Sequence, residues 1–202
     1  MYPDAWQGLT KSDLPPLSAV AAEAWVDPAQ HAYREALTSC CCVIRETFGL
    51  TVLITDVPAP FTGDLDGAAI TLDYELPPAE MLFTLLHLFG HTVQWTLSPA
   101  DREIGLADPR GRDEAFLAEV ARYERGAGEY ALSLLAVAGI TGLDVWLGEM
   151  TAADIAYLLH FYRTGEKMRH AASVVDFEPL LPRAIPSFLP QRWVARNAGV
   201  VI

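Results

Sequence analysis

The residues from about Ala79 to Leu97 are predicted to form a helix that is buried on every side. The centre of this segment, LLHLFGHTV, is almost wholly apolar, so the helix has no face suited to water. Pro77 and Pro78 precede it at a point where a missing backbone amide does no harm. The rest of the chain must therefore cover this helix, and 202 residues are enough to build one such core.

A helix and two strands are predicted before the buried helix. The stretch from Pro28 contains no internal breaker and is expected to be helical up to Gly49. Residues 51–56 and 68–73 are short and rich in β-branched residues, which predicts two strands joined by a loop or hairpin. The apolar face of the first helix is predicted to contain Ala32, Leu37, Cys41, Ile44 and Phe48.

Two helices are predicted after the buried helix. Residues 98–112 are polar and are expected to form a loop. Residues 113–138 carry apolar side chains at alternating steps of four and three, the pattern of a long helix packed along one face. Thr151 is expected to be the N-cap of the last helix, with Asp154 in a capping-box-like position and Gly165 near its end.

These elements predict an α+β fold, mainly helical with a small β-sheet, in a single domain of residues 1–202. Residues 1–16 are expected to form an N-terminal arm. Residues 179–202 contain four prolines and are expected to be an irregular C-terminal tail. Three apolar side chains should hold that tail on the surface: Phe188, Trp193 and Val194.

The composition excludes several classes of protein. A formal net charge of -12 argues against direct contact with DNA or RNA, because phosphate neutralisation needs clustered Lys and Arg. The apolar runs are too short to cross a bilayer, and the N-terminus lacks the pattern of a signal peptide. We therefore expect a soluble, cytoplasmic protein without a membrane contact.

Cys40, Cys41 and Cys42 are consecutive, which suits neither a disulfide framework nor a zinc site. Disulfide partners must be separated along the chain, and zinc thiolates are usually two to four residues apart. The three cysteines are interpreted as small apolar residues of a helix.

His87 and His91 are four residues apart on the buried helix, so both side chains point to the same side. Two imidazoles so placed can share one divalent cation, which is why zinc helices use the H-x-x-x-H spacing. The alternative is that each ring packs separately and bonds to backbone carbonyls. The apolar setting favours a metal, because two buried polar rings need partners and one ion would serve both.

Four segments resemble the ImmA/IrrE family of metallopeptidase-like proteins, also described by their DUF955 domain. The segments are FGLTVLITDVP, AAITLD, FTLLHLFGHTVQW and YERGAGEYALSLL, and they span a core of about residues 42–135. The resemblance implies a zincin-like metal helix packed on a second long helix. It also implies that His87 and His91 are metal ligands and that Glu124 is the third.

Helical periodicity allows two choices for the third ligand. If the apolar seam of helix 113–138 faces the core, Glu129 points to solvent, whereas Glu119 and Glu124 lie at the edges of the seam. Glu124 is the first choice because the resemblance places it there, and Glu119 is the reserve.

Leu88 departs from the family pattern. In HExxH enzymes the residue at this position is the glutamate that removes a proton from the metal-bound water. Leucine cannot do so, and a proton carrier contributes typically about 10²–10⁴-fold to the rate. Glu80, two turns before His87, and the Tyr130 hydroxyl are candidate substitutes for this acid/base function. His160 is a candidate extra ligand or a core histidine.

Three functions remain open from the sequence. The first is a metal-binding protein that is either a pseudo-protease or a metal-dependent enzyme of altered chemistry. The second is an active zinc metallopeptidase that uses a substitute base such as Glu80. The third is a protein-interaction scaffold without metal. The expected ion is Zn²⁺ or another divalent metal such as Fe²⁺, because two histidines and a carboxylate serve both; a protein partner or peptide substrate is expected.

Overall fold

The computed structural model of the chain describes residues 28–58, 61–108, 111–166 and 177–195. The predicted mainly helical α+β fold with a small sheet is confirmed in this part of the chain. In order, the elements are α2 (Pro28–Phe48), β1 (Thr51–Thr55), β2 (Gly63–Leu65), β3 (Ala69–Asp73), α3 (Pro78–Leu97), α4 (Pro99–Leu106), α5 (Glu114–Val137) and α6 (Asp144–Thr164).

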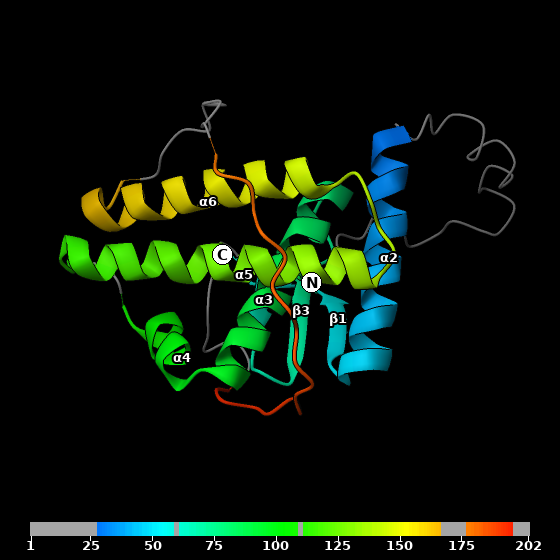
Figure 1. Ribbon diagram of the computed structural model, residues 1–202, viewed down its shortest axis with the longest axis horizontal. Coiled ribbons are helices and arrows are strands. Elements are labelled where there is room, and N and C mark those ends of the chain that lie inside the picture. The colour runs from blue at the N-terminus through cyan, green and yellow to red at the C-terminus, as the bar shows by residue number, and fades with distance from the viewer. Residues whose placement is uncertain (1–27, 59–60, 109–110, 167–176, 196–202) are drawn as a thin grey trace, which may run out of the picture.

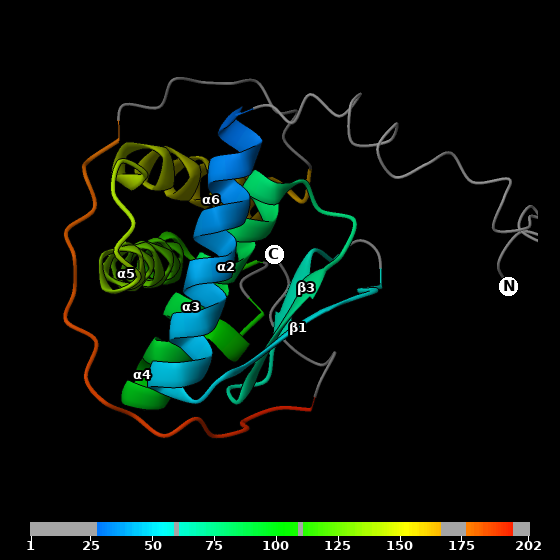
Figure 2. The ribbon, with the colours of Figure 1, turned by 90° about the vertical axis from the view of Figure 1, so that its right-hand side faces the viewer.

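Helix α3 is the centre of the fold, as its apolar sequence requires. Every residue from Met81 to Trp95 is buried. The sheet covers one side of α3, while α5 and α6 lie side by side on the other and α2 packs alongside it (Figures 1 and 2). The helix that carries the histidine pair is thus enclosed by the elements around it.

The sheet has the strand order β1-β3-β2, with β1 parallel and β2 antiparallel to β3. Strand β2 lies in the segment that was expected to be a loop or hairpin. The carboxylate of Asp66 shapes the β2–β3 turn by accepting hydrogen bonds from the amides of Ala68 and Ala69, both at 2.8 Å. Gly63 brings β2 close to α3, because a Cβ there would press on Thr84 and Leu88.

The prediction of a loop over residues 98–112 was wrong. Residues Pro99–Leu106 form α4, and the Ser98 hydroxyl caps this helix by accepting a hydrogen bond from the Asp101 amide at 3.1 Å. The short helix buries no residue completely. Its polar composition concealed an N-cap followed by a proline at the first helical position.

The predicted start of the last helix was also wrong. Helix α6 begins at Asp144, so Thr151 lies two turns inside it and is buried, and Asp154 is not in a capping box. Gly148 lies inside this helix although glycine disfavours helices; a side chain there would collide with the Phe177 ring. The predicted end is confirmed, since Gly165 caps α6 with a φ of 72°.

Helix α2 has the predicted extent but a different buried face. Ala32 is exposed, and the buried residues follow steps of four: Ala36, Cys40, Ile44 and Phe48. The three cysteines are free and helical, as predicted. Burial and the neighbouring Cys41 raise the pKa of the Cys40 thiol to about 12, which makes it unreactive at neutral pH.

The predicted N-terminal arm lies outside the described residues, as do residues 196–202 of the predicted tail. Residues 177–195 contain no helix or strand and run across α5 towards the sheet (Figure 1). Arg192 ends this stretch with an ion pair to Asp66 at 2.8 Å, and the Trp193 amide donates to the Asp66 carbonyl at 2.8 Å. Within the described ranges, no helix has the length and apolar content that crossing a membrane would require.

Candidate metal centre

The site forms where α3 crosses α5. Gly90 permits the close crossing, because a Cβ at this position would collide with the backbone of Ala127 on α5. Gly90 lies between the two histidines in sequence, so the closest approach of the helices falls beside both rings. The crossing brings Glu124, one turn before Ala127, to the histidine pair.

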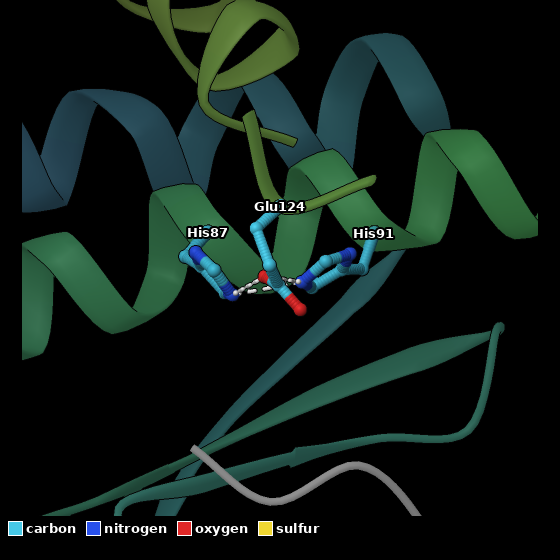
Figure 3. Close-up of side chains that lie close together, drawn as sticks. All are labelled: His87, His91 and Glu124. Atoms are coloured by element: carbon cyan, nitrogen blue, oxygen red, sulfur yellow. Dashed lines mark hydrogen bonds and ion pairs between the residues drawn. The ribbon is translucent and has the colours of Figure 1, made fainter. Parts of the chain in front are cut away.

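His87, His91 and Glu124 converge on one point (Figure 3). The Nε2 atoms of the two histidines are 2.7 Å apart. Oε2 of Glu124 lies 3.2 Å from Nε2 of His87 and 3.1 Å from Nε2 of His91. Three electron-pair donors, from two helices, therefore form a triangle small enough to hold one metal ion.

The side chain of Gln94 fixes the proton of His91. The Gln94 amide nitrogen donates to the Tyr123 carbonyl at 2.7 Å, so the amide oxygen must face His91. That oxygen lies 2.9 Å from Nδ1 of His91, which must therefore carry a proton and donate it. In the neutral ring, Nε2 is left with a lone pair directed at His87 and Glu124, as a metal ligand requires.

Two further side chains hold His91 in place. The ring of Tyr123 stacks on the imidazole, with centroids 4.4 Å apart and planes at 21°. The Tyr123 hydroxyl accepts a hydrogen bond from the Trp95 indole at 2.8 Å. Gly126 leaves room for Gln94, since a Cβ there would press on the Gln94 amide nitrogen. These contacts fix the imidazole in one orientation.

The electrostatics of the cluster depend on Glu124. Burial alone would raise the pKa of its carboxyl, but the charge interactions with His91 and His87 and the hydrogen bond from His87 outweigh burial and hold that pKa well below its usual range. Burial lowers the pKa of His91. Burial acts on His87 in the same direction, but the bond to Glu124 outweighs it, so the pKa of His87 is raised. Glu124 therefore stays ionised, and a proton on His87 competes with a metal.

The donor set fits a divalent ion such as zinc. Two ligands of a tetrahedral zinc ion, each about 2.0–2.1 Å from the metal, lie about 3.3 Å apart. The two edges of the triangle that end at Glu124 are close to this value. The third edge, between the Nε2 atoms of the two histidines, is shorter at 2.7 Å. This is the length of a hydrogen bond in which one ring donates a proton to the other. A cation would replace that proton and satisfy all three donors at once.

The other residues singled out from the sequence lie elsewhere. Glu119, the reserve ligand, is exposed and paired with Arg122 at 2.8 Å. Glu80 is an exposed carboxylate in the first turn of α3. Tyr130 is buried, with the Arg183 guanidinium 5.2 Å from its ring centre. His160 is partly buried on α6. None of these four belongs to the group that converges on the metal position.

Leu88, in the position of the family's general base, is completely buried. Its side chain lies against β2 at Gly63 and belongs to the hydrophobic core. No carboxylate takes its place on α3, where Glu80 is the sole acidic residue.

The sequence reasoning missed the roles of two residues that act on the site, Gln94 and the partly buried Asp154. Gln94 could have been found from its spacing, because it lies three residues after His91 on the same helix. Asp154 was assigned to a cap because the start of α6 was misplaced. Its Oδ2 atom is enclosed without a hydrogen-bond partner, and the charges that act on it are those of His87 and Glu124.

No known protein family, curated protein or solved structure matches the chain. The resemblance to the ImmA/IrrE family therefore remains a prediction from the sequence motifs.

Proposed function

We propose that this protein binds a divalent metal ion, with zinc as the first expectation, through His87, His91 and Glu124. The observation that carries the proposal is the Gln94 contact, which leaves the His91 lone pair directed at the other two donors. A histidine that only packs in a core does not need its proton fixed on the ring nitrogen that points away from the other two donors. This arrangement is what a metal-ligating histidine requires of its surroundings.

We further propose that the site does not act as an HExxH peptidase. The residue after the first histidine is an apolar core residue, and Glu80 is exposed at the start of the helix. The three donors are almost inaccessible, with exposed fractions of 3% for His87, 0% for His91 and 7% for Glu124. Closed sites are typical of structural metal binding, whereas catalytic sites keep an open position. The protein is thus a pseudo-peptidase of ImmA/IrrE type, in which the metal serves binding or structure.

Metal analysis tests the first part of this proposal. Protein purified without a histidine tag should contain about one equivalent of a divalent metal, and the His87→Ala/His91→Ala variant should contain none. Elemental analysis also identifies the ion, and iron in place of zinc would redirect the proposal towards oxidative chemistry. Equal metal content in both proteins would contradict the site.

Restoring the glutamate tests the second part. The parent should not hydrolyse casein or a fluorogenic peptide library, whereas Leu88→Glu supplies the missing base and should gain metal-dependent hydrolysis at a cost in stability. Leu88→Gln is the matched control, because it adds a polar group of similar size without a proton acceptor of the same strength. Metal-dependent hydrolysis by the parent would overturn the pseudo-peptidase assignment.

A further inference from the structure

Three buried polar atoms without a hydrogen-bond partner occur on α3 and α6: Nδ1 of His87, Oγ1 of Thr151 and Oδ2 of Asp154. Such atoms are rare in folded proteins, because an unpaired buried polar group costs about 1–3 kcal/mol. One of them belongs to a proposed metal ligand. The other two lie one turn apart on α6, the helix that packs against α5.

The two histidines differ in how their outer nitrogens are held. Nδ1 of His91 faces the Gln94 oxygen at 2.9 Å, whereas Nδ1 of His87 has no partner. When a metal occupies Nε2 of His87, the remaining ring proton must be on Nδ1 and needs an acceptor. Asp154 is the acidic residue besides Glu124 whose charge acts on His87, and its enclosed Oδ2 atom lacks a donor. The two unpaired atoms are not bonded to each other in the metal-free structure, so the pairing would form when a metal binds.

Charge balance favours the same residue. A divalent cation with two neutral imidazoles and the single carboxylate of Glu124 leaves one net positive charge in a buried site. Burying an uncompensated charge is strongly unfavourable. A second carboxylate would make the whole group neutral, and Asp154, whose charge acts on His87 and Glu124, can supply it.

We propose that Asp154 is a positioning residue of the metal centre, which accepts the Nδ1 proton of His87 and thereby orients this ring towards the metal. It acts through His87 rather than as a fourth ligand, since it is not among the residues whose donor atoms converge on the metal position. Three helices then contribute to the metal centre. The two histidines lie on α3, Glu124 is a ligand from α5, and Asp154 is a hydrogen-bond acceptor from α6. This inference rests on the proposed metal binding.

Zinc affinity of three variants, measured by competition with a chromogenic chelator, tests the inference. Asp154→Asn keeps the shape of the side chain but removes its charge, and it should weaken zinc binding by about 10–100-fold, as for other residues that hold metal-ligating histidines. Asp154→Glu restores a carboxylate and should recover part of the affinity. Glu149→Gln, which removes an exposed carboxylate from the same helix, should bind zinc like the parent.

Nitrogen NMR of the zinc-loaded protein provides a readout that a purely structural role would not change. The parent should show a protonated Nδ1 of His87 whose hydrogen exchanges slowly with water, and the signal should move and exchange faster in Asp154→Asn. The corresponding His91 signal, held by Gln94, should stay unchanged.

The outcomes separate the two proposals. If the parent binds no zinc, the proposed function fails and the role of Asp154 fails with it. If the parent binds zinc through His87 and His91 but Asp154→Asn binds it within twofold of the parent and leaves the His87 signal unchanged, only the role of Asp154 is overturned.

Discussion

At the scale of single residues, Gln94 decides whether His91 can be a ligand. Gln94→Met removes both of its hydrogen bonds while keeping the length of the side chain, so we expect zinc affinity to fall by about tenfold or more. Gln94→Glu is the control: it keeps an acceptor for the His91 proton and should bind more tightly than Gln94→Met. Parent-like zinc binding by Gln94→Met would show that the ring does not depend on this contact.

The raised pKa of the Asp154 carboxyl should make the stability of the metal-free protein depend on pH. Burial raises the pKa of its carboxyl from 3.8 to about 6, with a further rise from Glu124 and an opposing effect of His87. The unfolded chain ionises first as the pH rises, so this group destabilises the fold progressively from about pH 4 to 6 and fully above that. The difference between the two pKa values corresponds to about 3 kcal/mol of unfolding free energy as an upper value.

Removing the charge should therefore stabilise the metal-free protein. In urea unfolding with a chelator present, Asp154→Asn should exceed the parent in unfolding free energy at pH 7.5, and the difference should shrink at pH 4. Glu149→Gln should show no such pH-dependent difference. An Asp154→Asn protein that is less stable than the parent at pH 7.5 would argue that the ionised carboxylate is already well paired.

At the scale of elements, the crossing of α3 and α5 depends on Gly90. Gly90→Ala should push the helices apart, which we expect to lower the unfolding free energy by about 1–3 kcal/mol and to reduce the zinc content, since Glu124 moves with α5. Gly148→Ala, at the Phe177 contact on α6, is the comparison variant; it should lose stability but retain zinc. Equal zinc content in both variants would show that zinc binding does not depend on the close approach of α3 and α5.

The sequence predicted the elements unevenly, and the reasons are physical. The long helices could be predicted for three reasons: α5 has an apolar spacing that repeats over several turns, α3 has a long apolar run that begins at two prolines, and α2 contains no internal breaker. Helix α4 could not, because it is too polar to show a buried face. The start of α6 could not either, because the helix contains Gly148, whose need for a missing side chain arises from a contact with the distant Phe177 ring. The histidine pair was visible because its two members are one turn apart. The link between Asp154 and His87 was not, because no spacing rule relates residues of different helices and the misplaced start of α6 put Asp154 in a cap.

At the scale of the whole molecule, metal binding should add to the stability of the fold. The donors belong to α3 and α5, so the site exists only when these helices are packed together. Free zinc at about 100 times its Kd should add about 2.7 kcal/mol, or roughly 5–10 °C in Tm for a domain of this size. The His87→Ala/His91→Ala variant should show no shift in a thermal melt; an equal shift would indicate zinc bound elsewhere.

The contact between Arg192 and Asp66 joins residues 126 positions apart. During synthesis, the sheet and the crossing helices are complete in sequence before Arg192 is added to the chain. We therefore expect the segment of residues 177–195 to close over a nearly formed domain as the last step of folding. Until then, the helices of the candidate site would be less covered on one side than in the folded protein. We expect an ion to enter the site most readily in this interval, because the folded structure leaves the three donors almost inaccessible.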